Sequence, residues 1–498
     1  MAVQTPQSAI ERWQISRRKF LAGVAAAGLA SFTRTMFSMP AEPAGWRGLP
    51  PRPDQKPLDF GEMADAFDSY VMDPAHGVNL RDKTGRQYFA SALETTDEGG
   101  LTCYGPVAMG KELRGSGLDE LARSLKAYFS EPYGLFLDGP GKALCEYWYL
   151  MNVNALAFAL IQTRFAHDPE WLARVERSVA SLREMAHQIG YDFNDQGYDY
   201  AAGKPFTLQN VYRQPDAVGG YSYVMLLAWK LTGKDFCLAE AKAGMDRYLA
   251  FAKNPWYEVP SGAMAVLAAA YLQSTSYPAN SSKALKFVLD SKVGLMASGR
   301  WGACPVDGLM AGFATEPPGQ AYSMESMVTF PYLMPALRYR PDLADEVARY
   351  ALNAAANLRW FYPEFLPKDS QSRPDLPPMV PYERLNREAK GHSPYAEGDF
   401  AGHRSVYGGA YVMWLDKMVE PQGDPWLLRW DLTKTNFLEP DLAPTFLYYN
   451  PGPEERRIRI EAVGRLHDLK SNQVLRVQGG KVELALHSQD ARVIEFVM

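Results

Sequence analysis

The sequence has little of what metal, disulfide and nucleotide chemistry require. Its 498 residues include four cysteines and seven histidines. The cysteines (Cys103, Cys145, Cys237 and Cys304) are far apart and show no C-x-x-C spacing, which argues against zinc and against a disulfide framework. Their apolar and aromatic sequence neighbours predict buried thiols. No H-x-H, H-E-x-x-H, dinucleotide-binding, P-loop or G-x-S-x-G pattern occurs, so we expect no cofactor and no serine nucleophile.

The chain also lacks an excess of positive charge. It has 52 Lys and Arg against 57 Asp and Glu, a net charge of −5. Residues 1–41 hold five basic residues and one acidic residue, so without them the balance is 47 against 56, or −9. This balance argues against nucleic acid as a partner, although local arginines can still bind an anionic sugar.

The N-terminal segment has the features of an export signal. Ser16-Arg17-Arg18-Lys19-Phe20-Leu21 precedes an Ala/Gly-rich apolar run, residues 22–30, that is too short to span a membrane. This resembles the bacterial twin-arginine export signal. The resemblance implies the twin-arginine translocase as a partner, membrane contact only transiently through the signal, and a periplasmic or secreted protein. We assign residues 1–44 to the signal and the Pro-rich residues 45–60 to a linker or arm.

Helical patterns repeat from residue 61 to about residue 435. Some segments, such as 170–189 and 343–358, are amphipathic, whereas others, such as 149–161 and 262–272, are apolar nearly all round. Alternation of covered and amphipathic helices predicts a double-layered ring. The expected helices are 62–71, 118–129, 143–163, 170–189, 217–231, 236–251, 262–273, 282–289, 323–338, 343–358 and 403–418.

The pattern changes to that of strands in residues 436–498. Hydrophobicity alternates with period two around 446–450 and 457–463, and three short strand-like segments follow, separated by turn residues such as Asn472. These segments predict a small antiparallel β-sandwich. We expect structural roles for the histidines of this region.

The helical repeat, with its aromatic and acidic helix starts, resembles the (α/α)6-type toroid of many carbohydrate-active enzymes. A toroid followed by a small C-terminal antiparallel β-sandwich resembles several glycoside hydrolases and polysaccharide lyases. The resemblance implies a mainly α fold, with residues 61–435 as the catalytic toroid and residues 436–498 as the sandwich. It also implies a carbohydrate substrate.

The starts of the apolar helices carry the candidate site. Inner helices of a toroid begin at one end of the ring, and their unpaired N–H groups bind anions and hydroxyls. Aromatic faces stack on sugar rings, whereas carboxylates, amides and arginines bind hydroxyls and uronates. The residues predicted to bind substrate are Glu146, Tyr147, Trp148, Asn152, Arg213, Gln214, Trp256, Tyr257, Asp399, Arg404 and Tyr407.

Hydrolysis of a glycosidic bond is the expected chemistry. It needs one carboxyl group as acid and a second as base or nucleophile. Asp216 is the first candidate, because it lies near the positive end of a helix dipole and follows a base and an amide. Glu258, Glu325 and Asp399 are its candidate partners. For Glu258 and Glu325 the alternative interpretation is a solvated or capping carboxylate.

Three other functions stay open. A polysaccharide lyase would cleave by β-elimination, with Tyr212, His392, His403 or Tyr407 as base and Arg213, Arg404, Gln214 or Asn210 neutralising the uronate. A terpenoid-cyclase-like enzyme would need an apolar cavity, and a non-catalytic glycan-binding protein would not depend on its carboxylates. The predicted catalytic residues are Asp216, Glu258, Glu325, Tyr212, His392 and His403.

Overall fold

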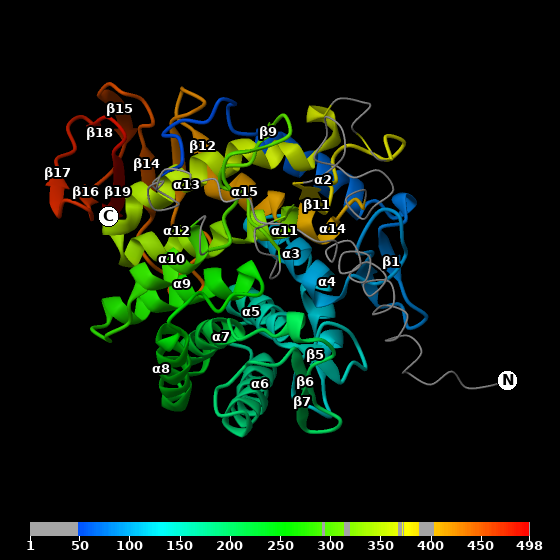
Figure 1. Ribbon diagram of the computed structural model, residues 1–498. Coiled ribbons are helices and arrows are strands. Elements are labelled where there is room, and N and C mark those ends of the chain that lie inside the picture. The colour runs from blue at the N-terminus through cyan, green and yellow to red at the C-terminus, as the bar shows by residue number, and fades with distance from the viewer. Residues whose placement is uncertain are drawn as a thin grey trace, which may run out of the picture. The chain divides into compact units, whose positions relative to one another are not determined.

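The computed structural model describes residues 48–290, 294–312, 319–366, 371, 373–387 and 403–497. Residues 44–498 form one compact unit, which is mainly helical and has a small antiparallel sheet towards the C-terminus (Figure 1). The predicted export signal lies outside the described residues and stays a prediction. Within the described ranges, no helix is long and apolar enough to cross a membrane.

One set of helices, the ring helices, is buried on nearly every face. In α9, every residue from Val259 to Leu272 is buried. Each of these helices contacts the next in the order α3, α5, α7, α9, α12, α11, α14, and α14 contacts α3. The order of contacts therefore closes on itself. The ring helices are α3 (Gly100–Leu113), α5 (Tyr147–Arg164), α7 (Ala217–Thr232), α9 (Val259–Ser274), α11 (Ser323–Val328), α12 (Phe330–Tyr339), α14 (Val406–Gly409) and α15 (Val412–Met418).

A second set of helices packs outside the first. α2 contacts α15, α6 and α8 contact α7, α10 contacts α9, and α13 contacts α12. α6 buries one stripe that includes Trp171, Val175 and Leu182 and exposes charged residues on its other face. The amphipathic pattern predicted for 170–189 is confirmed in α6, whereas the segment 343–358, predicted to be amphipathic, is buried at every position from Tyr350 to Asn357. The outer helices are α2 (Phe60–Met72), α6 (Pro169–Gln188), α8 (Asp235–Ala250), α10 (Ser281–Leu289) and α13 (Ala344–Asn357).

The ring helix α3 is not predicted from the sequence. Three glycines and Pro106 lower its helix propensity. A Cβ atom on Gly105 would lie 3.1 Å from Leu156 of α5, and one on Gly110 would lie 2.8 Å from Met413 of α15. The small residues therefore allow close packing against both neighbours. Tertiary contacts, rather than local helix propensity, therefore stabilise α3.

Several expected helices are interrupted. The start of the segment 143–163 forms the strand β5 (Leu144–Glu146), which pairs with β6 (Gly197–Asp199), and β6 pairs with β7 (Lys204–Phe206). The segment 323–338 divides at Thr329 into α11 and α12, where Pro331 lacks an N–H group. The segment 118–129 forms α4 (Asp119–Ser124) and a 3₁₀ turn, and 403–418 forms the short α14 and α15.

Towards the C-terminus, six antiparallel strands pair in the order β12-β13-β14-β19-β16-β17. β15 and β18 pair separately, and Tyr448, Ile460, Leu466 and Leu484 from both groups share one hydrophobic core. β12 and β13 precede the predicted domain boundary at residue 436. The strands are β12 (Val419–Pro421), β13 (Leu428–Asp431), β14 (Thr445–Tyr449), β15 (Arg456–Glu461), β16 (Arg465–Asp468), β17 (Gln473–Leu475), β18 (Lys481–Leu486) and β19 (Ala491–Val497).

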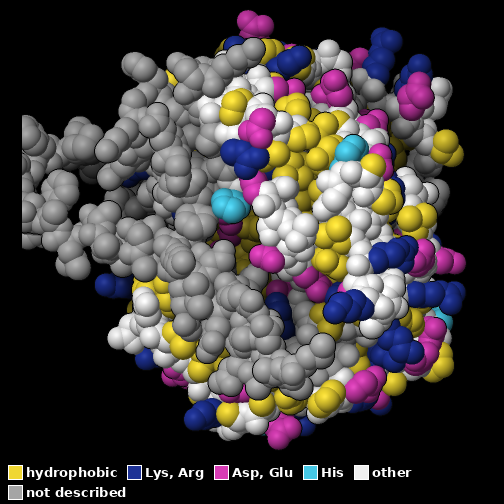
Figure 2. All heavy atoms as spheres, turned by 90° about the vertical axis from the view of Figure 1, so that its right-hand side faces the viewer, with side chains coloured by type: hydrophobic (Ala, Val, Ile, Leu, Met, Phe, Trp, Pro, Cys, Tyr) yellow, Lys and Arg dark blue, Asp and Glu magenta, His cyan; other side chains and the backbone are white. Residues whose placement is uncertain are grey.

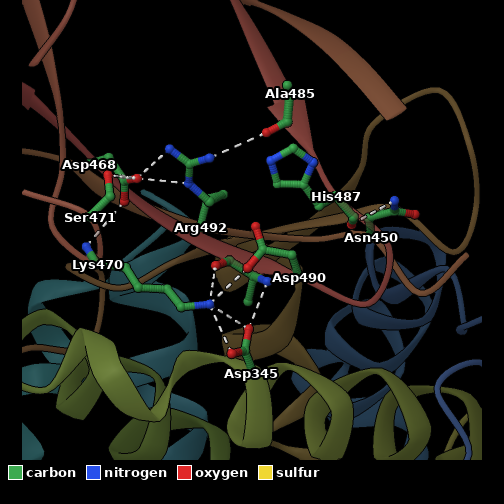
Figure 3. Close-up of polar contacts among 10 residues, drawn as sticks. Asp345, Asn450, Asp468, Lys470, Ser471, Ala485, His487, Asp490 and Arg492 are labelled. Atoms are coloured by element: carbon green, nitrogen blue, oxygen red, sulfur yellow. Dashed lines mark hydrogen bonds and ion pairs between the residues drawn. The ribbon is translucent and has the colours of Figure 1, made fainter. Parts of the chain in front are cut away.

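Lys470 joins this sheet to the helices. Its Nζ lies 2.7 Å from Asp345 Oδ1 of α13 and 2.8 Å from Asp490 Oδ1, just before β19 (Figure 3). Within the sheet, Arg492 forms an ion pair with the buried Asp468. The two regions are therefore held together by charge as well as by apolar packing.

Candidate active site

The ring helices begin on one side of the protein. In Figure 1, β5 lies to the right of α5, α11 to the right of α12 and α14 to the right of α15, so these helices run from right to left. Trp148 N at the start of α5 donates to Gln214 Oε1 before α7 (2.8 Å), and Glu258 N before α9 donates to Asp216 Oδ2 (3.0 Å). Figure 2 faces this side and shows it hollowed near its centre, with hydrophobic and acidic side chains in the hollow.

Two glutamates and a tyrosine gather where α11 and α14 begin. Tyr407, in the first turn of α14, donates a hydrogen bond to Glu383 Oε1 (2.5 Å). Glu383 precedes β11 (Arg384–Asn386), and β11 pairs with β10 (Gln320–Tyr322). β10 leads directly into α11, which carries Glu325 in its first turn. Strand pairing thus brings together residues from three distant parts of the chain.

These three residues also influence one another electrostatically. Burial, together with the negative charges of Glu383 and Glu325, raises the pKa of Tyr407 well above its ordinary value. The phenol is therefore protonated and able to donate a hydrogen bond at neutral pH. Glu383 and Tyr407 are half-buried, whereas Glu325 is 5% exposed, so Glu325 lies deeper.

Aromatic side chains surround the same place. The half-buried Tyr149 is near enough to Tyr407 to contribute to its raised pKa. Its ring centroid lies 3.8 Å from that of Trp148. Burial, Tyr332 and Glu325 raise the pKa of Tyr411. Carboxylates among aromatic rings form a surface that can bind and stack on a polyhydroxy ring.

The predicted residues Asp216 and Glu258 lie where α7 and α9 begin. Both are 1% exposed, and Glu258 N donates to Asp216 Oδ2. Burial raises the pKa of Asp216 to about 7, against the lowering effect of the backbone N–H groups of Tyr257 and Glu258. Within the described part of the chain, Asp216 Oδ1 has no hydrogen-bond partner. The structure therefore brings these two residues together at a buried junction of two ring helices.

The predicted substrate-binding residues Glu146 and Gln214 bind each other. Gln214 Nε2 donates to Glu146 Oε2 (2.8 Å), and Gln196 Nε2 donates to Glu146 Oε1 (2.9 Å). Both carboxylate oxygens of Glu146 are therefore engaged by the chain itself. This network fixes the start of α5 against the start of α7.

The two predicted arginines are also held by the chain. Arg213 Nη1 lies 3.2 Å from Asp195 Oδ1 on the surface. Arg404 is fully buried, donates to the carbonyl oxygen of Pro377 (3.0 Å) and lies 4.3 Å from the ring centroid of Tyr382. These contacts support structural roles, and substrate binding stays a prediction for both arginines.

The candidate bases for an elimination reaction lie in different segments of the chain. Tyr212 is buried in a 3₁₀ turn before α7. His403 is half-buried, and its carbonyl oxygen accepts a hydrogen bond from Glu383 N (2.8 Å). His392 and the predicted substrate-binding residue Asp399 lie outside the described residues. Their predicted roles stay predictions.

The remaining predicted residues lie at different depths. Trp256 is half-buried and Tyr257 is buried in front of α9. Tyr147 is buried, with its ring 4.9 Å from that of Phe193. Asn152 is fully buried one and a half turns into α5. Roles in substrate binding stay predictions for all four predicted residues.

Glu383 is the residue that sequence reasoning misses. The predicted site residues lie near the starts of apolar helices, whereas Glu383 precedes the short strand β11. The available signal is the sequence Pro381-Tyr382-Glu383-Arg384, which places an aromatic residue, an acid and a base together. Only the pairing of β11 with β10 connects this signal to Glu325.

The cysteines are free and buried, as predicted. Burial raises the pKa of Cys304 to about 11, and burial likewise raises the pKa of Cys103 and Cys145. Protonated buried thiols of this kind are suited to packing rather than to nucleophilic attack. Across the described ranges, no group of three or more His, Cys, Asp or Glu side chains is placed to hold a metal ion.

No protein-family model matches the chain, and no curated protein sequence matches it. Solved structures similar to it are carbohydrate-active enzymes. A sugar epimerase from a ruminal bacterium has 12% identity and a TM-score of 0.44, covering 70% of this chain and 97% of its own. A cellobiose 2-epimerase from Spirochaeta thermophila has 11% identity and a TM-score of 0.42, covering 72% and 98%. A family 76 glycoside hydrolase from Bacteroides thetaiotaomicron has 10% identity and a TM-score of 0.44, covering 72% and 77%.

Proposed function

We propose that this chain is a carbohydrate-active enzyme that hydrolyses glycosidic bonds in the hollow where its ring helices begin. We further propose an (α/α)6-type toroid as its architecture, supported by the closed order of contacts among the ring helices. The observation that carries the function is the hydrogen bond from Tyr407 to Glu383 beside Glu325. This arrangement places the carboxyl groups of Glu383 and Glu325 among aromatic rings in the same hollow.

The two glutamates suit different roles. Glu383 is half-buried, reaches the surface and accepts a hydrogen bond from Tyr407, which orients its carboxylate as base or nucleophile. Glu325 lies deeper, among phenol rings, and we assign it the protonation of the leaving oxygen. Tyr149 and Trp148 provide aromatic faces for a sugar ring.

The protonation of Tyr407 argues against Tyr407 as the base of an elimination. A tyrosine acting as base in β-elimination must first lose its proton. Burial and the charges of Glu383 and Glu325 raise the pKa of Tyr407 well above its ordinary value, so deprotonation is disfavoured. Tyr407 is better suited to hold Glu383 in place than to abstract a proton.

We also propose export by the twin-arginine route to the periplasm or beyond. The sequence Ser16-Arg17-Arg18-Lys19-Phe20-Leu21 supports this. Expression in a bacterium with and without a functional twin-arginine translocase tests it. We expect the protein outside the cytoplasm only when the translocase is present, and Arg17→Lys with Arg18→Lys should retain it inside.

A panel of neutral and uronic-acid glycans tests the proposed reaction. The full chain is incubated with each glycan while new reducing ends and the ultraviolet absorbance of unsaturated uronates are measured together. We expect reducing ends without absorbance, and we expect Glu325→Gln and Glu383→Gln to abolish them. Absorbance that rises with the reducing ends would establish a lyase instead, and no cleavage of any glycan would contradict an enzyme of this class.

A further inference from the structure

Residues 403–405, which lead into α14, are held on both edges by extended neighbouring segments. Arg404 forms an antiparallel bridge with Tyr382 on one edge, and Ser405 forms one with Ala92 on the other. Backbone hydrogen bonds of 2.8 to 3.1 Å accompany both bridges. The backbone in front of α14 is therefore fixed from two sides.

The register of this pairing places His403 directly opposite Glu383. One step from the bridge between Tyr382 and Arg404 pairs residue 383 with residue 403, and the hydrogen bond from Glu383 N to His403 O (2.8 Å) agrees with this register. Directly opposite residues of an antiparallel pair project their side chains to the same face, with Cβ atoms about 4.5–5.5 Å apart. The imidazole and the carboxylate therefore stand side by side.

The neighbouring residues show which face this is. Tyr382 and Arg404 project to the opposite face, where both are 0% exposed and the Arg404 guanidinium lies 4.3 Å from the ring centroid of Tyr382. Glu383 and His403 are half-buried instead, so both reach the surface. Tyr407 donates to Glu383 on this second face. His403 therefore shares the face that holds the proposed catalytic carboxylate.

A third carboxylate fixes the backbone beside His403. Both carboxylate oxygens of Glu94 accept from Arg404 N (3.1 and 3.0 Å). The carbonyl oxygen of Arg404 accepts from Leu93 N (3.1 Å), and its side chain donates to the carbonyl oxygen of Pro377 (3.0 Å). Because the residue after His403 is held at all three points, the backbone position of His403 is set in advance. A group fixed in this way loses little conformational freedom when it binds a ligand.

One oxygen atom can bond to both side chains. Two hydrogen bonds of about 2.8 Å that meet at one oxygen join groups about 4.5–5.5 Å apart, which is the spacing of directly opposite residues. An imidazole can donate to a hydroxyl or accept from it, and a carboxylate has lone pairs for a hydroxyl as well as for Tyr407. Hydrogen bonds to a hydroxyl beside the reacting carbon of a sugar strengthen in the transition state.

We propose that His403 is a catalytic residue that binds, together with Glu383, one hydroxyl of the sugar residue at the bond to be cleaved. The enzyme consequently selects glycans in which this hydroxyl is free. The role rests on the proposed function, because the contact is made to the substrate of that reaction. It assigns His403 to substrate binding instead of proton abstraction.

His403→Ala tests the contact, and the C-terminal sheet supplies a matched control. His467 is also half-buried and lies directly opposite a glutamate, Glu495, with its Nδ1 3.5 Å from Glu495 Oε2. On the glycan that the unmodified protein cleaves, we expect His403→Ala to lower kcat/KM by about ten- to a hundredfold and His467→Ala to leave it unchanged. His403→Gln, whose amide also donates and accepts, should retain more activity than His403→Ala. Equal kcat/KM in His403→Ala and His467→Ala would overturn the role of His403.

Substrates that each lack one hydroxyl identify the shared group. Each hydroxyl of the sugar residues beside the cleaved bond is replaced singly by hydrogen, and kcat/KM is measured for the unmodified protein and for His403→Ala. One replacement should cost the unmodified protein about tenfold or more but cost His403→Ala less than about threefold, because the variant has already lost the contact. Equal costs in both proteins at every position would overturn the shared hydroxyl.

The role of His403 and the proposed reaction fail separately. Cleavage with unchanged kinetics in His403→Ala would keep hydrolysis and reject the role of His403. If no glycan is cleaved, the same glycans are titrated calorimetrically into the unmodified protein and into His403→Ala. Affinity about tenfold lower in His403→Ala would then reject hydrolysis and keep His403 as a binding residue, whereas equal affinity or no binding would reject both. Unsaturated-uronate absorbance that is lost in His403→Ala would make His403 the base of an elimination and overturn its assignment to binding.

Discussion

The hydroxyl of Tyr407 donates to the carboxylate of Glu383, although 24 residues separate them and they belong to different elements. Tyr407 opens α14, whereas Glu383 precedes β11. Because β11 pairs with β10 and β10 leads into α11, the same arrangement places Glu325 nearby. A short strand pair therefore assembles the site.

Glu383→Gln should reduce kcat by about a thousandfold, because the amide cannot act as base or nucleophile. Tyr407→Phe should reduce kcat by about tenfold, since the carboxylate stays but loses its orienting hydrogen bond. Steady-state kinetics on the glycan that the unmodified protein cleaves measures both. Tyr277→Phe is the matched control, because Tyr277 donates to Asp246 (2.7 Å) on outer elements. Equal losses in Tyr277→Phe and Tyr407→Phe would refute a special role for Tyr407.

Asp216 should make stability depend on pH. Burial raises its pKa from 3.8 to about 7 in the folded protein, so its protonated form is favoured by folding. This contribution is fully present below about pH 4 and is lost as the pH rises through about 7, a change of up to about 4 kcal/mol. Asp216→Asn should therefore be more stable than the parent at pH 8, with little difference at pH 4.

Denaturant unfolding at both pH values measures the Asp216 effect. Asp138→Asn is the matched control, because Asp138 is buried but accepts hydrogen bonds from Thr102 and pairs with Lys142 (3.2 Å). That substitution should be destabilising at pH 8. Stabilisation by both substitutions, or by neither, would contradict the assignment for Asp216.

Glu146→Leu should lower the free energy of unfolding by about 2–4 kcal/mol. The substitution leaves the amides of Gln196 and Gln214 without their acceptor, and both amides are buried. Glu176→Leu is the control, because Glu176 forms a surface ion pair with Lys234 and the substitution should change stability by less than about 0.5 kcal/mol. Unchanged stability with a raised KM in Glu146→Leu would instead support the predicted role in binding substrate.

Lys470→Met should destabilise the protein by about 1–3 kcal/mol, because it leaves the carboxylates of Asp345 and Asp490 facing each other without their shared cation (Figure 3). Burial lowers the pKa of Lys470, but its hydrogen bonds to both aspartates outweigh this and raise it. Lys481→Met is the control, since Lys481 is exposed and 3.7 Å from Glu461, and should have little effect. The double variant Lys470→Met, Asp345→Asn should recover part of the loss in denaturant unfolding.

The sequence alone determined the helical class, the two kinds of helix and the C-terminal strands. These depend on local periodicity, which the chain carries in every segment: α6 repeats apolar residues on one face, and α9 is apolar all round. Asp216, Glu258 and Glu325 are predicted as catalytic residues because each lies at the start of an apolar helix. Periodicity does not show whether helices close into a ring, and helix propensity argued against α3, which forms because Gly105 and Gly110 fit closely against α5 and α15.

Only the tertiary structure decided which polar side chains are bound by other residues of the protein. Glu146 and Arg404 were predicted to bind substrate, but Glu146 accepts hydrogen bonds from Gln196 and Gln214, and Arg404 donates to a backbone carbonyl. Glu383 joined the site through strand pairing between residues more than sixty positions apart. The physical reason is that hydrogen-bond satisfaction and burial depend on which distant segments meet, whereas the sequence specifies only the groups that each segment brings.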